Sequence, residues 1–205
     1  MVEFHALTKF MMSDRVYTRQ HQFTLFICSC KHPSQGKKLM TINAPFNEFS
    51  TSIQPDWIDD NGHMNVAFYH LVFDLAARPF FNWLGFTEEN RKAHNISTFA
   101  LETHLSYLSE VKVDAGVRVE SRLLDTNGKR FHFYQEMYKT ESNRLAASHE
   151  SLGTVVDMQQ RKSTTMPDVI SKRLEEIKTA HSHLPRTWQM GHVMAVDSKP
   201  AKTRT

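Results

Sequence analysis

The sequence is poor in cysteine and has no long apolar run. Its two cysteines, Cys28 and Cys30, lie too close together for a useful structural disulfide. No second Cys/His pair lies at zinc-finger spacing from them, so we predict no metal site. No apolar run approaches the roughly 20 residues that a membrane-spanning helix needs. We therefore expect no membrane insertion and a reducing compartment, which we take to be the cytoplasm, with the mitochondrion as the alternative.

A strong excess of one charge is also missing. The 205 residues include 25 basic and 22 acidic ones, which gives a formal net charge of +3. Without a concentrated positive field or a duplex-binding motif, nucleic acid is not an expected partner. The hydrophobic content of 40% is sufficient for one globular core. We predict a poorly organised extension over residues 1–39, a domain over 40–180 and a polar, basic tail over 181–205. The extension is either a targeting segment or dispensable.

The spacing of apolar residues predicts one long helix followed by four strands. Over residues 65–77 apolar positions recur every three or four residues, which is typical of an amphipathic helix. Pro79 should kink or restart this helix, and Gly85 should end it. Alternating apolar residues then predict strands at 99–107, 117–123, 131–137 and 146–156.

Two further elements complete the expected fold. A short strand around residues 49–53 precedes the long helix, and a last helix follows Pro167. This order predicts an α+β fold, in which one face of an antiparallel sheet packs on the helix. Self-association would cover the other face, most simply in a two-fold dimer.

The segment from Trp57 to Asn65 is the strongest functional feature of the sequence. Its polar turn, which holds Asp59, Asp60 and His63, leads directly into the predicted long helix. A helix start offers unpaired N–H groups and a positive dipole end, which suit a developing negative oxygen. Asp, Asn and Gly are also ordinary turn residues, but a turn requires neither the tryptophan nor the His-Met-Asn that follows.

These residues resemble a known family. Pro55–Gly85, PDWIDDNGHMNVAFYHLVFDLAARPFFNWLG, is similar to the Asp-x-x-Gly-His-x-Asn signature of hot dog fold acyl-CoA thioesterases, the 4-hydroxybenzoyl-CoA thioesterase-like superfamily. Residues 101–137, LETHLSYLSEVKVDAGVRVESRLLDTNGKRFHFYQEM, resemble the betainyl-CoA thioesterase domain associated with carnitine dehydrogenase. The resemblance covers about residues 46–178. It implies an antiparallel sheet wrapped around one long helix, in a homodimer or homotetramer with active sites between subunits.

The resemblance also assigns the catalytic carboxylate to Asp59, because this residue aligns with the first position of the signature. Asp60 occupies a position that the family fills variably. Val66 departs from the family, whose members often carry Asn or Asp there. The implied activity is hydrolysis of an acyl-CoA thioester, of betainyl-CoA or another short acyl-CoA. CoA is part of the substrate, and no cofactor is expected.

Thioester hydrolysis needs a base or nucleophile and donors for the oxyanion. Asp59 can fill either role, and no Gly-x-Ser-x-Gly nucleophile elbow is present. We assign the oxyanion contact to the backbone N–H groups of Met64 and Asn65. His63 would orient the water or hold Asp59. Asn65 would contact the thioester or cap the helix.

The other candidate site residues each have an alternative, purely structural explanation. Glu102 lies in an apolar strand with His104 on the same face, and it is either a second catalytic carboxylate, half of a buried ion pair or an edge residue. Lys129 and Arg130, in the predicted hairpin, would bind CoA phosphates unless they are simply solvated.

Three aromatic residues near the signature, Trp57, Phe68 and Tyr69, would line the acyl pocket or belong to the core. Two alternative functions remain at this point. One is a hot dog enoyl-CoA hydratase or dehydratase, and the other is a non-catalytic module that binds acyl-CoA.

Overall fold

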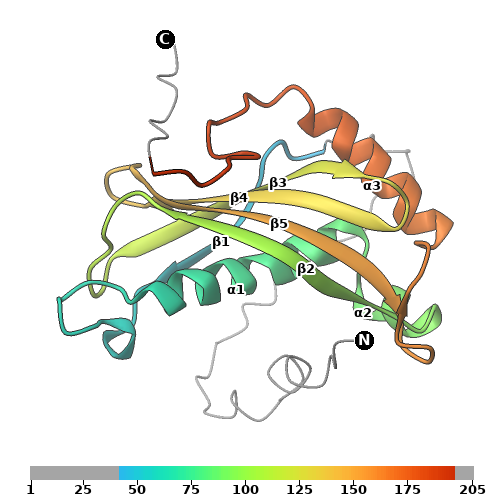
Figure 1. Ribbon diagram of the computed structural model, residues 1–205, viewed down its shortest axis with the longest axis horizontal. Coiled ribbons are helices and arrows are strands. Elements are labelled where there is room, and N and C mark those ends of the chain that lie inside the picture. Colours follow the sequence, from blue (N-terminus) through green and yellow to red (C-terminus); the bar gives the residue numbers. More distant parts are fainter. Residues whose placement is uncertain (1–41, 197–205) are drawn as a thin grey trace, which may run out of the picture. The chain divides into compact units, whose positions relative to one another are not determined.

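An antiparallel sheet lies over one long helix, α1 (Val66–Leu84), in the computed structural model, which describes residues 42–196 (Figure 1). The predicted extension over 1–39 and both cysteines lie outside these residues. The sheet order is β1-β3-β4-β5-β2, and β6 pairs with β5. The strands are β1 (Phe46–Ser52), β2 (Ile96–Tyr107), β3 (Gly116–Thr126), β4 (Arg130–Lys139), β5 (Leu145–Asp157) and β6 (Lys162–Ser163). The predicted long helix and four following strands are confirmed.

α1 runs from its Asn65 cap to Gly85 without interruption. Gly85 has a φ of 108°, a conformation that glycine adopts without strain. The restart expected at Pro79 does not occur. An internal proline costs a helix about 3 kcal/mol, but the fully buried Phe73 and Phe80 on either side of it pack against the same sheet. Their burial offsets the missing hydrogen bond.

β2 departs from the predicted alternation. A register irregularity between Ala100 and Glu102 shifts the strand relative to β5. Leu101 and Tyr107, two of the alternating apolar residues that would share one buried face of a regular strand, are 46% and 49% exposed. β2 is the last strand of the sheet, so one of its sides has no neighbouring strand in the described residues. The alternation was correct as a sign of a strand but wrong as a guide to burial.

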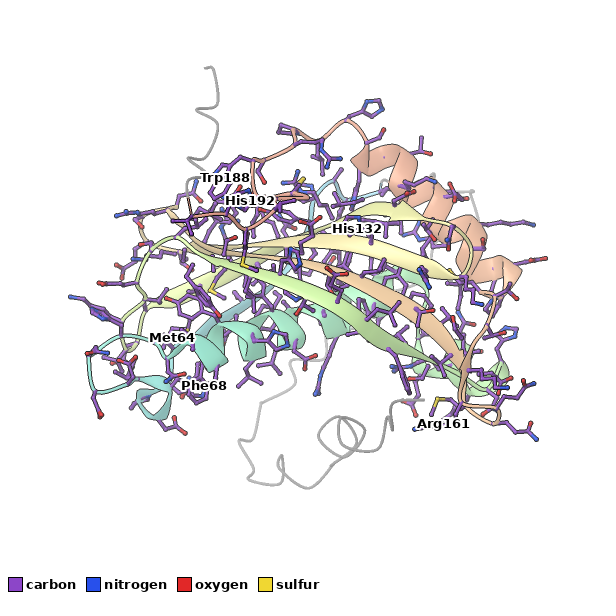
Figure 2. All side chains as sticks on the ribbon, viewed as in Figure 1. Met64, Phe68, His132, Arg161, Trp188 and His192 are labelled. Carbon is purple, nitrogen blue, oxygen red and sulfur yellow. The ribbon has the colours of Figure 1, made fainter. Side chains whose placement is uncertain are left out.

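The sheet face opposite α1 is partly covered by the chain itself. After α3 (Asp168–His181), residues 182–196, which we call the C-terminal strap, run back over this face (Figure 1). Figure 2 shows Trp188 and His192 of the strap on the far side of the sheet from Met64. Where the strap lies, the chain itself covers part of the face that we expected self-association to cover.

Polar contacts attach the strap to the sheet. Arg122 donates to the carbonyl of Pro185 at 2.7 Å, and the N–H of Gly191 donates to Glu150 at 2.7 Å. The Thr187 hydroxyl donates to the Tyr134 hydroxyl at 3.0 Å. Such contacts do not follow an apolar pattern, so the sequence predicted only a polar tail here.

A further helix, the short α2 (Glu88–Ala93), lies between α1 and β2 in the chain. The core forms two clusters along α1. In one cluster, residues from the C-terminal part of α1 pack with residues of α3. In the other, residues from the N-terminal part of α1 pack with Met64, Val111 and Val117. The second cluster anchors both ends of the segment over residues 57–65, which we call the signature turn, because Met64 is buried in this cluster and Ile58 packs against it. No helix in residues 42–196 is long and apolar enough to cross a membrane.

Candidate active site at the start of the long helix

The signature turn closes on itself before α1. The Gly62 N–H donates to the carbonyl of Asp59 at 2.9 Å, and the Asp59 N–H donates to the carbonyl of His63 at 3.0 Å. Gly62 has a φ of 78°, in the left-handed region that a residue with a side chain rarely adopts. An isolated bridge between Ile58 and Met64 joins the two ends of the turn. The turn therefore holds Asp59 at a fixed place beside the helix start.

The Asp59 carboxylate is half-buried and only partly engaged. Its Oδ1 accepts a hydrogen bond from the Asn61 N–H at 2.9 Å. Its second oxygen has no hydrogen-bond partner among residues 42–196. Asp60, by contrast, is exposed. This geometry orients the Asp59 carboxylate and leaves one oxygen available for a substrate or water.

The two N–H groups that we assigned to the oxyanion are not free. Met64 donates its N–H to the carbonyl of Val111 at 2.8 Å, and Asn65 donates its N–H to the carbonyl of Trp57 at 2.9 Å. The assignment to Met64 and Asn65 is therefore wrong for the folded chain. The cause is that the residues leading into α1 pair with neighbouring segments.

The free donor lies one residue further on. The Ala67 N–H is taken by the Asn65 side chain at 3.0 Å, and the Phe68 N–H donates to the Asn65 carbonyl at 3.0 Å. Val66 alone of these first helical residues has an N–H with no acceptor in the described part of the chain, and its side chain is exposed. Its N–H is the candidate oxyanion donor. Asn65 acts as the helix cap, so the capping alternative is correct.

His63 pairs with a residue that the sequence did not single out. Its Nε2 lies 3.0 Å from the Oε2 of Glu110, which follows β2. The two side chains are 32% and 69% exposed, so the pair lies at the surface of the site. In this arrangement the His63 side chain is held by Glu110 and not by Asp59.

The three predicted pocket aromatics divide into two groups. Trp57 and Phe68 stack with ring centres 5.6 Å apart and remain half-buried (Figure 2 labels Phe68). Tyr69 is only 4% exposed, and its hydroxyl donates to the carbonyl of Ser109 at 3.3 Å. Burial raises the pKa of Tyr69, and the negative charges of Glu110 and Asp59 raise it further. Tyr69 belongs to the core, whereas Trp57 and Phe68 offer an accessible aromatic surface.

Two predicted sites lie apart from the signature turn. Lys129 and Arg130 form the hairpin at the far end of β3, whose first residue, Gly116, lies at the end near the turn. The ten steps from Gly116 to Thr126 span roughly 33 Å at the usual rise of a strand. Within one chain, the predicted phosphate ligands therefore do not reach the region of Asp59.

Glu102 lies in the edge strand β2, where its side chain is 66% exposed. Its Oε1 is 3.1 Å from the Nε2 of His104. The expectation of a buried charge is wrong, and the edge alternative is correct. The strand is apolar in sequence, but its irregular register and edge position leave the carboxylate in solvent.

Comparison with known proteins identifies the family of this chain. Residues 53–174 match the model of the thioesterase-like superfamily. The chain belongs to the thioesterase-like superfamily. It is 34% identical over 148 residues to a betainyl-CoA thioesterase of Pseudomonas aeruginosa, which covers 72% of this chain and 93% of that protein. It is 30% identical to an L-carnitine dehydrogenase/betainyl-CoA thioesterase of Ruegeria pomeroyi, over 70% of this chain and 29% of that one.

Solved structures show the same hot dog fold as this member of the thioesterase-like superfamily. A Staphylococcus aureus protein in complex with CoA has a TM-score of 0.70 at 24% identity, over 78% of this chain and 99% of that one. A 1,4-dihydroxy-2-naphthoyl-CoA thioesterase from Synechocystis has a TM-score of 0.55 at 12% identity, over 66% and 96% of the two chains. The hot dog fold expected from the sequence is confirmed.

Proposed function

We propose that the protein hydrolyses an acyl-CoA thioester to the free acid and CoA. The observation that carries this proposal is that one short segment before α1 holds a half-buried carboxylate and leads into a helix whose first N–H has no acceptor in residues 42–196. Asp59 keeps one oxygen without a partner, and the Val66 N–H has no acceptor in the described chain. Membership of the thioesterase-like superfamily supports the same reaction.

The proposed chemistry needs no other nucleophile. Asp59 takes a proton from a water whose oxygen bonds to the thioester carbon, or its own oxygen bonds to that carbon to give an anhydride that water then cleaves. The carbonyl oxygen becomes negative and accepts a hydrogen bond from the Val66 N–H, a contact worth roughly 3 kcal/mol. The carbon–sulfur bond then breaks, and the electron pair leaves with the CoA thiolate. No cofactor takes part in this scheme.

The proposed substrates are betainyl-CoA and other short acyl-CoA thioesters. Two of the similar proteins carry the name betainyl-CoA thioesterase. The stacked pair of Trp57 and Phe68 would provide aromatic faces for a trimethylammonium group, because ring faces attract cations. The test therefore compares a panel of acyl-CoA thioesters with different acyl groups.

We also propose that the enzyme is a cytoplasmic homodimer that associates through β2. This 12-residue edge strand has one unpaired side in the described sheet and exposes Leu101 and Tyr107. An unpaired, partly apolar edge is suited to antiparallel addition of the same strand from a second copy. A homotetramer would require a second contact surface between subunits in addition to β2.

The central test replaces Asp59 with asparagine. Thiol release is followed with short, branched, aromatic and quaternary-ammonium acyl-CoAs. Loss of the base or nucleophile should lower kcat by about 10²–10⁴-fold without changing the thermal unfolding midpoint. Asp60→Asn is the matched control and should keep the wild-type rate, since Asp60 is exposed.

Three results would contradict the proposal. Turnover that is unchanged in the Asp59→Asn variant would remove the catalytic role of this carboxylate. Hydration of an enoyl-CoA without thiol release would favour a hydratase. Binding of acyl-CoA in calorimetry without hydrolysis of any member of the panel would favour a non-catalytic binding module.

A further inference from the structure

A hollow of about 690 Å³ lies at the same end of the sheet as the signature turn. Its walls are residues 108–115, which connect β2 to β3, and the turn that joins β4 to β5. The volume lies within the range of small-molecule sites. The hydrolysis scheme above does not use this hollow.

The hollow is continuous with the candidate active site. Glu110 lines it, and the same carboxylate lies 3.0 Å from the Nε2 of His63. Ser109 also lines it, and its carbonyl accepts the hydrogen bond from the hydroxyl of Tyr69. A molecule that extends away from Asp59 past Glu110 would enter this hollow.

Three cationic side chains on its walls have no partner among the residues that the structure describes. Lys112, Lys139 and Arg144 form no ion pair and no side-chain hydrogen bond with any residue of the described range 42–196. Arg118 shows the usual alternative, since its guanidinium contacts both Glu120 and Asn143. Unpaired cations around a hollow are suited to phosphate oxygens, which accept strong charge-assisted hydrogen bonds.

Carboxylates also line the hollow and limit its positive potential. Glu110 is occupied by His63, whereas Asp114 and Glu141 have no ion-pair partner in the described chain. The three cations therefore face two unpaired acids. This balance predicts moderate attraction for phosphates, together with an affinity that rises when an acid is neutralised.

We propose that this hollow binds the phosphate groups of CoA, with Lys112, Lys139 and Arg144 as their ligands. The inference rests on the proposed function, because it assumes that the substrate is a CoA thioester. It replaces the predicted phosphate ligands Lys129 and Arg130, which lie at the opposite end of β3. The pantetheine arm then runs from the thioester at Asp59 past Glu110 to the nucleotide.

The test compares two substrates that differ only in the phosphorylated nucleotide. The double variant Lys112→Ala/Arg144→Ala is assayed with an acyl-CoA and with the corresponding acyl-pantetheine. Its KM for the acyl-CoA should rise by about tenfold, since each exposed charge contact contributes up to about fivefold. Its KM for the acyl-pantetheine and its kcat should stay at the wild-type values.

The matched control is Lys129→Ala/Arg130→Ala, which also removes two positive charges but at the far hairpin. Its KM for both substrates should equal that of the wild type. An equal rise of KM for the two substrates in the hollow variant would overturn the proposal. A rise of KM for the acyl-CoA in the hairpin variant alone would overturn it as well.

Calorimetry with CoA itself separates this proposal from the proposed hydrolysis. The wild type should bind CoA about tenfold more tightly than Lys112→Ala/Arg144→Ala, and Glu141→Gln should bind it about threefold more tightly than the wild type. CoA binding of this pattern without thioester hydrolysis would support phosphate binding in the hollow and contradict the proposed hydrolysis. Hydrolysis with identical CoA affinity in all three proteins would support the proposed hydrolysis and overturn the proposal that the hollow binds the CoA phosphates. No CoA binding by the wild type would overturn it too.

Discussion

Two pairs of polar side chains, one on each side of the sheet, show how differently these two sides are built. Beneath the strap, Arg122 and Glu136 lie 2.5 Å apart with side chains that are 8% and 3% exposed. At the start of α1, His63 and Glu110 lie 3.0 Å apart and are 32% and 69% exposed. The first pair is sealed within the fold, and the second remains in contact with solvent.

The difference extends to the groups around each pair. Arg122 also donates to the carbonyl of Pro185, so the strap supplies a second acceptor for its buried guanidinium. Around the second pair, the Val66 N–H and one oxygen of Asp59 stay without a partner in the described residues. A buried charge must be satisfied to be tolerated, whereas a reactive site must keep donors and acceptors for its substrate. The polar groups on the strap side are therefore satisfied within the fold, whereas the start of α1 keeps the unpaired groups that the proposed hydrolysis needs.

The largest expected effect comes from breaking the buried pair. Glu136→Ala leaves the Arg122 charge buried with one partner fewer, and it should lower the free energy of unfolding by about 3–5 kcal/mol. Urea denaturation measures this change. The control is Glu120→Ala, which removes a more exposed partner of Arg118 and should cost less than about 1 kcal/mol. Equal losses in the two variants would remove the distinction between sealed and open pairs.

The same contrast applies to a second imidazole. His149 is 5% exposed and stacks on Phe73, with its Nδ1 3.0 Å from the Oε1 of Gln135. Burial lowers the pKa of His149 to about 3. Between the unfolded pKa near 6.5 and the folded value, the unfolded chain binds a proton at this residue and the folded chain does not. The His149 contribution to stability is therefore lost progressively as the pH falls below about 6.5.

Between pH 7 and pH 5, this residue should cost about 2 kcal/mol of unfolding free energy. His149→Gln removes the titration, so the variant should lose about 2 kcal/mol less than the wild type over the same pH interval. Denaturant melts at both pH values measure the difference. Any constant packing loss in the variant cancels in this comparison. Parallel pH dependence in the two proteins would show that His149 is not held neutral by burial.

These contrasts also explain which features could be predicted from the sequence. Periodicity identified α1 and the long strands because their burial repeats along the chain. The polar turn before α1 could be predicted because turn residues and helix caps act locally, and the family resemblance then assigned the catalytic role within it to Asp59. Glu110 and the strap could not be found this way. Glu110 reaches His63 only because the Met64 N–H pairs with Val111, a contact between distant parts of the sequence.

The free Val66 N–H was missed for a related reason. Sequence shows where a helix begins, but it does not show which of its first N–H groups already have acceptors. Asn65 accepts hydrogen bonds from the first turn of α1 with both its side chain and its carbonyl, and its own N–H donates to the carbonyl of Trp57. Similarly, the charges of Lys129 and Arg130 suit phosphate binding, but the length of β3 places both residues far from the signature turn.

A smaller effect is expected at the helix cap. Asn65→Ala removes the acceptor of the Ala67 N–H and should lower the free energy of unfolding by about 1 kcal/mol. Asn65→Asp keeps an acceptor oxygen and should retain wild-type stability. Chemical denaturation measures both variants, and thiol release follows their activity. If the aspartate variant is stable but inactive, Asn65 contacts the thioester in addition to capping α1.

The smallest effect on stability is expected at the open pair itself. Glu110→Gln removes the charge that faces His63, yet it should change the free energy of unfolding by less than about 0.5 kcal/mol, because the Glu110 side chain is largely solvated. Its kcat should fall severalfold, since the His63 ring loses the partner that fixes its orientation beside Asp59. Denaturation and thiol-release assays report the two quantities separately. Glu89→Gln, an exposed residue of α2, should change neither. A stability loss as large as that of Glu136→Ala, with kcat unchanged, would make His63–Glu110 a structural pair and remove the division of roles between the two sides of the sheet.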